Sequence, residues 1–302
     1  MSDRVRILAL SDINWRPYHR NTNLPKLSTN LIKLSRLVEE VEPALVLLGG
    51  DLVDDFKREE NAERIAYWQE LSKFLDYLES KKVQCYFVKG NWDAIPEYDE
   101  LATRQYKYVR EISNKLAEAN NLRVFGISHA LTDKLSTMKE LRRMVPQPVD
   151  VVLAHAEGRR RIWLFELPTK VIVTGHFDQK LCIIRNKLFI SFSHFPGEYA
   201  VVEYLPTQIS AAYFSLGGMY TEPQRYERYE AHLMDGIWTW ETDQPNEWLQ
   251  YGLQMEALLT LKEHEQSLSI DEKREAIDDL LQQGVYKAHI LEYIPGARRI
   301  LK

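Results

Sequence analysis

The chain has 302 residues, of which 45% are hydrophobic and 27% charged, and its formal net charge is −5. This composition is ordinary for a folded globular protein, and the acidic balance argues against a dedicated nucleic-acid binder, which usually carries a basic surplus. No apolar stretch approaches the roughly 20 residues needed to cross a bilayer, and the N-terminus lacks the pattern of a signal peptide. Cys85 and Cys182 lie in apolar runs, which is typical of buried free thiols in a reducing compartment. We therefore expect a cytoplasmic protein without a membrane partner.

Up to residue 174, short β-rich runs alternate with segments that have helical spacing. The spacing predicts helices over residues 26–41, 60–79 and 106–119. The apolar runs predict strands over residues 5–10, 44–48, 83–88, 122–127, 149–154 and 170–174. Such alternation predicts a largely parallel core sheet with helices on its outer faces.

The pattern changes after residue 180. Four strands separated by short turns are predicted over residues 180–185, 187–192, 199–204 and 209–214, which indicates an antiparallel end to the sheet system. Ser215-Leu216-Gly217-Gly218 marks a boundary between a domain at 1–216 and a mainly helical extension at 217–302. A helix is predicted over 247–266, and Ser269 with Glu272 forms a capping-box pattern that begins another. We expect the extension to pack on the core, to cover the rim of the site, or to form a homo-oligomer contact.

Polar side chains follow the predicted strands at five places. These are Ser11-Asp12-Ile13-Asn14, Gly49-Gly50-Asp51-Leu52-Val53-Asp54, Gly90-Asn91-Trp92-Asp93, His155, and Gly175-His176-Phe177-Asp178. In an open α/β sheet, ligands bind beyond the carboxyl ends of the strands. Any one of these segments is typical of a turn, but all five together predict a single polar rim.

The ordered series resembles the motifs of the calcineurin-like metallophosphoesterase family, which are D-x-H, G-D-x-x-D, G-N-H-[DE], a lone His, and G-H-x-H. The resemblance covers roughly residues 5–205 and implies an α/β fold, a four-layer α/β/β/α sandwich. It also implies two divalent metal sites that share one carboxylate. By this resemblance Asp51 is the shared ligand, Asn91, His155 and His176 complete one site, and Asp12, Asn14 and Asp178 complete the other.

Two departures from the family pattern fall on the second of these sites. Asn14 and Asp178 stand where the family has histidine. The second site thereby becomes all oxygen, which favours manganese, magnesium or calcium, whereas the first keeps two imidazoles suited to manganese, iron or zinc. We expect two divalent ions, manganese first, with iron, zinc and magnesium as alternatives; occupancy of only one site is the competing interpretation.

A third departure concerns catalysis. Trp92 stands where the family has a histidine that the resemblance assigns to assisting the leaving group, with the following acidic residue, here Asp93, orienting it. Tryptophan has no transferable proton near neutral pH. The catalytic candidates are therefore Asn91, Asp93 and Trp92, although Trp92 is also interpreted as packing on the rim or stacking on a substrate.

Several further polar side chains are close in sequence to the motifs. Candidates for substrate binding are Arg16, His19, Arg20, Arg159, Arg160 and His194. Each has the competing interpretation of a solvated loop or an exposed helix charge. His129, after the strand at 122–128, could reach the rim, but an ordinary polar turn is favoured.

Two functional hypotheses follow. The first is a metal-dependent phosphohydrolase, preferably a phosphodiesterase, acting on a phosphate ester through a metal-activated hydroxide. The second is a catalytically weak or inactive protein that uses the same fold for binding.

Overall fold

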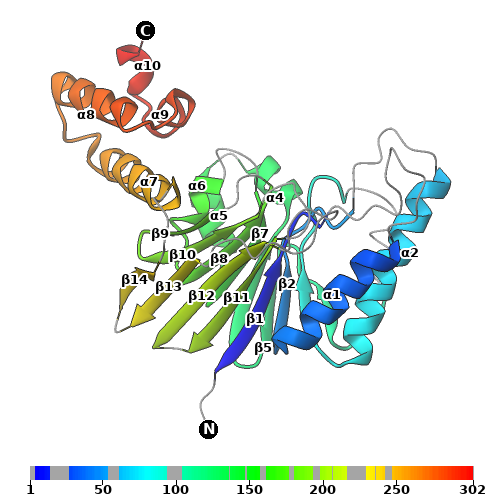
Figure 1. Ribbon diagram of the computed structural model, residues 1–302. Coiled ribbons are helices and arrows are strands. Elements are labelled where there is room, and N and C mark those ends of the chain that lie inside the picture. Colours follow the sequence, from blue (N-terminus) through cyan, green and yellow to red (C-terminus); the bar gives the residue numbers. More distant parts are fainter. Residues whose placement is uncertain are drawn as a thin grey trace.

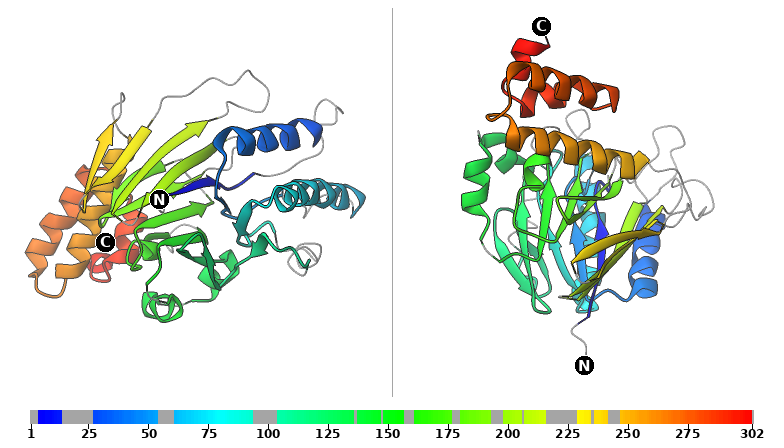
Figure 2. Two further views of the ribbon diagram at one scale, coloured as in Figure 1. Left: turned by 90° about the horizontal axis from the view of Figure 1, so that it is seen from below. Right: turned by 90° about the vertical axis from the view of Figure 1, so that its left-hand side faces the viewer.

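Two β-sheets packed face to face form the centre of the computed structural model, with helices on both outer faces (Figures 1 and 2). This is the expected four-layer α/β/β/α arrangement, followed by a helical C-terminal region. The structure describes residues 4–13, 27–53, 61–93, 104–135, 137–146, 148–156, 161–176, 180–192, 198–205, 207–215, 229–234, 236–241 and 247–301.

The first sheet has eight strands in the order β14-β13-β12-β11-β1-β2-β3-β4. Its strands β1 to β4 are parallel, and β11 to β14 add an antiparallel half. The bounds are β1 (Val5–Leu10), β2 (Leu45–Leu48), β3 (Gln84–Phe87), β4 (Val109–Glu111), β11 (Glu198–Leu205), β12 (Gln208–Ser215), β13 (Tyr229–Met234) and β14 (Ile237–Glu241).

The second sheet has six strands in the order β5-β6-β7-β8-β10-β9. Strands β6, β7, β8 and β10 are parallel, and the edge strands β5 and β9 are antiparallel to their neighbours. The bounds are β5 (Leu116–Ala119), β6 (Leu122–Ile127), β7 (Val151–His155), β8 (Val171–Gly175), β9 (Lys180–Ile184) and β10 (Lys187–Ser191). The parallel strands end on one side of the sandwich, which brings the polar segments that follow them together.

Apolar side chains from facing strands fill the space between the sheets, including Ile7, Tyr86 and Val173, all essentially inaccessible to solvent. A hydrogen bond also links the two sheets: the Tyr204 hydroxyl donates to Asp150 Oδ1 at 2.8 Å. Burial of this apolar surface is the main stabilising contribution to such a sandwich.

Helices cover both outer faces. On the first sheet, α1 (Leu27–Val41) and α2 (Asn61–Ser80) pack against each other and bury a cluster that includes Leu37, Leu71 and Phe74. The cluster on the second sheet takes residues from shorter helices and from the C-terminal ones. The shorter helices are α4 (His129–Lys134), α5 (Met138–Met144) and α6 (Arg161–Leu164), and the first of the C-terminal helices is α7 (Glu247–His264).

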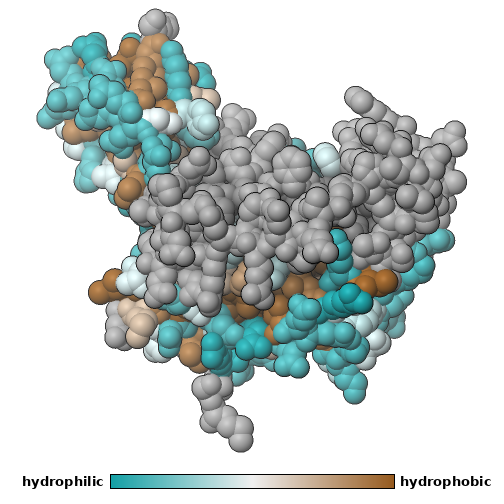
Figure 3. Space-filling model, viewed as in Figure 1, coloured by the Kyte–Doolittle hydropathy of each residue, from teal (hydrophilic) through white to brown (hydrophobic). Residues whose placement is uncertain are grey.

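The C-terminal helices are anchored through α7, which lies along β9 (Figure 1). Its Gly252 permits this close approach, because a Cβ there would lie 3.1 Å from the carbonyl oxygen of Ile183. Beyond it, α8 (Ile270–Gln282), α9 (Lys287–Tyr293) and α10 (Ala297–Ile300) lie together at one end of the molecule, and their buried side chains join the apolar cluster of the second sheet. On the face seen in Figure 3 these helices are largely hydrophilic around a narrow hydrophobic strip.

Two parts of the secondary structure differ from expectation. The helix predicted over 106–119 is wrong: this segment forms β4, which pairs with β3, and β5, which pairs with β6. The backbone N–H groups of Lys107, Tyr108 and Val109 donate to the Glu79 carboxylate, which holds the chain extended. In addition, the extension that is predicted to be mainly helical contributes two strands, β13 and β14, to the first sheet.

None of the helices in the described part of the chain is both long and apolar enough to pass through a lipid bilayer.

Candidate metal centre

The polar rim lies where β1, β2, β7 and β8 end, and the backbone there is unusually crowded. Asp12, Asp51 and His176 all have positive φ values, of 50°, 48° and 81°, which is uncommon for residues other than glycine. Gly90 allows this crowding: a Cβ at that position would lie 2.1 Å from Asp51 Oδ1. Backbone strain of this kind is concentrated at functional sites.

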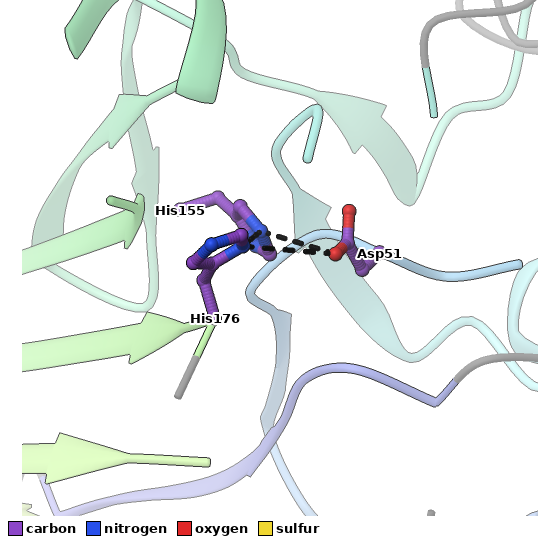
Figure 4. A group of neighbouring side chains, drawn as sticks. All are labelled: Asp51, His155 and His176. Carbon is purple, nitrogen blue, oxygen red and sulfur yellow. Dashed lines mark hydrogen bonds and ion pairs between the residues drawn. The ribbon is translucent and has the colours of Figure 1, made fainter. Parts of the chain in front are cut away.

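Asp51, His155 and His176 converge in the centre of the rim (Figure 4). Asp51 Oδ2 lies 3.3 Å from His155 Nε2 and 4.0 Å from His176 Nδ1, and the two imidazole nitrogens are 3.1 Å apart. All three side chains are buried. Among the described residues these are the three that form a candidate metal-binding group, so the structure brings together the core of the predicted first site.

The orientation of His155 is set by the backbone. Its Nδ1 lies 2.8 Å from the carbonyl oxygen of Gly49, which can only accept, so Nδ1 carries a proton and Nε2 faces Asp51. Burial lowers the pKa of His155, but the nearby carboxylates of Asp51 and Asp12 outweigh it and raise the pKa to about 9. For the Asp51 carboxyl, burial acts in the other direction and raises the pKa. The nearby His155 outweighs this effect and holds the pKa of Asp51 below its usual range.

The amide of Asn91 completes this group. One of its two amide atoms lies 3.0 Å from Trp92 Nε1, and since indole N–H is only a donor, that atom is the oxygen. The Asn91 nitrogen then faces His176 Nδ1 at 2.8 Å and Asp51 Oδ2 at 3.2 Å. The amide is therefore placed beside all three candidate ligands.

Asp12 is buried beside the same group. Its Oδ2 accepts from the Ser11 hydroxyl at 2.7 Å and from the His176 backbone N–H at 2.9 Å. Burial raises the pKa of the Asp12 carboxyl to about 7; His155 opposes this shift and Asp51 adds to it. Asp12 thus joins β1 to the residue after β8, next to Asp51 and His155.

The side chain of Asp93 points into the protein. Its two oxygens accept from the backbone N–H groups of Leu52 (3.0 Å) and Gly90 (2.8 Å), and the side chain is fully buried. Burial and the neighbouring Asp51 carboxylate raise the pKa of Asp93 to about 7. One carboxylate oxygen of Asp93 therefore binds the loop that carries Asp51, and the other binds the loop that carries Asn91. Asp93 thereby holds the two loops together.

His129 was favoured as part of an ordinary turn, but it stands at the rim. Its ring centroid is 6.1 Å from that of His155 and 5.8 Å from that of His176. Its place after a predicted strand allows this position, but the neighbours that it meets depend on β6 lying beside β7 in the sheet.

The other predicted site residues lie outside the described part of the chain. They are Asn14 and Asp178 of the second metal site and the substrate-binding candidates Arg16, His19, Arg20, Arg159, Arg160 and His194.

Solved structures similar to this one include TT1561 of Thermus thermophilus, which is 16% identical with a TM-score of 0.46 and covers 66% of this chain and 94% of its own. A dimetal phosphatase from Danio rerio is 12% identical with a TM-score of 0.46, covering 76% and 99%. Vacuolar Protein Sorting 29 from Cryptosporidium parvum is 13% identical with a TM-score of 0.42, covering 76% and 98%. No curated protein matches the sequence.

The model of the calcineurin-like phosphoesterase family matches residues 5–180, more than half of the chain. The chain belongs to the calcineurin-like phosphoesterase family. Membership implies divalent metal binding, and the first candidate site of this chain fits it. Carboxylate and imidazole atoms converge there from three strand ends. His155 is also held through its other nitrogen by a carbonyl, the arrangement that supports metal-bound histidines.

Proposed function

We propose that this phosphoesterase is a metal-dependent hydrolase of phosphate diesters. The observation that carries the proposal is the convergence of Asp51 Oδ2, His155 Nε2, His176 Nδ1 and the Asn91 amide within one buried cluster. A buried set of two imidazoles and a carboxylate suits manganese, iron or zinc. Asp12, with Asn14 and Asp178 as its proposed partners, would supply oxygen ligands for a second ion.

When bound, divalent ions would polarise the phosphoryl oxygens and lower the pKa of water, so that hydroxide is available near neutral pH. The residues of the chain supply the geometry. The Gly49 carbonyl keeps His155 in a fixed tautomer, and Asp93 fixes the loops that carry Asp51 and Asn91. In this site the amide of Asn91 lies where it could ligate an ion or donate to a phosphate oxygen.

The charge of the site favours a diester over a monoester. Asp12 and Asp51 are both completely buried within the rim, and Asp178 is a further carboxylate in the proposed set. A diester carries one negative charge, whereas a monoester carries close to two near neutral pH. With three carboxylates against two divalent ions, the loaded site is less positive than the family pattern, and its attraction for a doubly charged monoester falls more than that for a singly charged diester.

The decisive experiment assays the purified full-length protein with bis-p-nitrophenyl phosphate in added Mn²⁺, beside Asp51→Asn and His264→Gln variants. Asp51→Asn keeps the size of the side chain but removes its charge, whereas His264 is exposed on α7. We expect turnover by the wild type and by His264→Gln, and its loss in Asp51→Asn. Equal rates for all three proteins, or none above background, would contradict the proposal.

The second candidate is a binding protein that keeps the fold without efficient catalysis. Trp92 favours it, because its indole N–H is engaged by Asn91 and offers no proton to a leaving group. Metal binding without turnover of the diester would support this candidate.

A further inference from the structure

A third imidazole, that of His129, faces the two candidate metal ligands from the end of β6. Its ring is 12% exposed, and its centroid lies 5.8 Å from that of His176 and 6.1 Å from that of His155. The family motifs do not include this position. His129 therefore adds to the site a group that the series of motifs did not predict.

The backbone around His129 is firmly held. Its N–H donates to the Lys89 carbonyl oxygen at 3.0 Å, directly before Gly90 and Asn91. The preceding Ser128 caps α4 by accepting from the Leu131 N–H, and Asn114 bonds both the N–H and the hydroxyl of Ser128. Such fixed backbone is what a preorganised catalytic group needs.

His129 has a carboxylate partner of its own. Asp133, one helical turn further along α4, places Oδ2 at 3.8 Å from His129 Nδ1. This leaves Nε2 as the ring nitrogen on the side away from Asp133. A carboxylate beside an imidazole orients the ring.

His129 is next to the candidate ligands without being one of them. Its ligand atoms are not part of the group formed by Asp51, His155 and His176, whose atoms all lie within 4.8 Å of one another. A ring at this distance from the cluster is placed to meet a substrate held there.

The two residues that correspond to the family's leaving-group pair cannot act as that pair. Trp92 carries no transferable proton, and both oxygens of Asp93 accept from backbone N–H groups. We propose that His129 protonates the leaving group in place of the histidine replaced by Trp92, with Asp133 as its positioning residue. This inference rests on the proposed hydrolase function.

Hydroxide forms a new bond to phosphorus, and the bond from phosphorus to the leaving oxygen breaks. That oxygen keeps the electron pair and takes the proton from His129 Nε2. The neutral imidazole then recovers a proton from water, which regenerates hydroxide.

The test compares two diesters that differ only in leaving group, methyl p-nitrophenyl phosphate and methyl phenyl phosphate. Phenolate is the stronger base and needs the proton more. In His129→Gln we expect kcat for the phenyl ester to fall by about 10²–10⁴-fold, and that for the nitrophenyl ester by no more than about tenfold. Asp133→Asn should show the same selectivity with a smaller loss, and His264→Gln should leave both rates unchanged.

Calorimetric titration with Mn²⁺ supplies a second readout. His129→Gln should bind Mn²⁺ as the wild type does, which also shows that the variant is folded; a large loss of affinity would make His129 a ligand and overturn the inference. Equal losses for both esters would overturn it as well, while the wild-type rates still support hydrolysis. If the wild type hydrolyses neither ester, the hydrolase function fails and the inference fails with it.

Discussion

The Nδ1 atom of His155 lies 2.8 Å from the carbonyl oxygen of Gly49, directly after β2 of the facing sheet. This contact joins the two halves of the sandwich at the metal site. It fixes which nitrogen of the imidazole faces Asp51 and therefore which one is available to a cation.

Replacing His155 should remove the first metal site. We expect His155→Gln to lower Mn²⁺ affinity by at least about 100-fold, because loss of outer-shell support alone costs about 10–100-fold and this change removes the ligand. Isothermal titration calorimetry measures the effect, with His264→Gln, at an exposed position of α7, as the matched control. Unchanged affinity in His155→Gln would show that the ion binds elsewhere.

Mn²⁺ affinity should rise with pH. A cation must displace the proton of His155, whose pKa is about 9, and that of Asp12, whose pKa is about 7. Each proton released makes affinity rise by about tenfold per pH unit below the pKa of its group. Titrations between about pH 6 and pH 9 measure the slope, and a flat profile would contradict the assignment of His155 as a ligand.

Without divalent ions the stability should depend on pH in the opposite direction. The folded pKa of His155, about 9, lies above its ordinary value of 6.5. The pairing of the imidazolium with Asp51 therefore stabilises the fold fully below about pH 6.5, and this contribution is lost as the pH rises through about 9. Urea unfolding in a chelator should show the wild type losing its advantage over His155→Gln across this range.

The convergence of three predicted ligands is easier to expect from the sequence than the structure of the chain around them. Asp51, His155 and His176 each come at or just after the end of an apolar run, and parallel strands bring such ends to one edge. The interaction that fixes Asp93 inward cannot be read in this way, because its donors, Leu52 and Gly90, come from two different loops.

The helix predicted over 106–119 is wrong because contacts distant in sequence decide the structure of this segment. Val109, Ile112, Leu116 and Ala119 recur at helical spacing, yet the segment pairs with two different sheets. Asn114, with a φ of 60°, interrupts the regular backbone conformation between the two strands. For His129 the sequence favours an ordinary turn over a place at the rim for a related reason, since its neighbours at the site belong to strands that pair only in the folded sheet.

Cation binding should change the fluorescence emission of Trp92. The Asn91 oxygen accepts from Trp92 Nε1 at 3.0 Å while the nitrogen faces the ligand cluster. A cation is bound by the oxygen, so the amide must turn and its nitrogen would then oppose the indole N–H. We expect Zn²⁺ to shift the tryptophan emission of the wild type and to have much less effect in Trp92→Phe; equal shifts would place the change elsewhere.

The fit of the loops around Asp51 can be tested at Gly90. A Cβ at this position would lie 2.1 Å from Asp51 Oδ1 and 2.4 Å from the Asp51 backbone nitrogen. Because backbone cannot yield as a flexible side chain does, Gly90→Ala should lower the free energy of unfolding by about 1–3 kcal/mol. It should also weaken Mn²⁺ binding by displacing the Asp51 carboxylate.

Gly296→Ala is the matched control for this prediction. The nearest atom to a Cβ there is Glu265 Oε1 at 2.8 Å, the end of a side chain that can move, and the site lies among the C-terminal helices. Urea unfolding and calorimetry on both variants separate the two effects. We expect a smaller loss of stability and unchanged Mn²⁺ affinity in Gly296→Ala. If Gly90→Ala bound Mn²⁺ as tightly as this control, the position of Asp51 would not depend on close packing against the loop that carries Asn91.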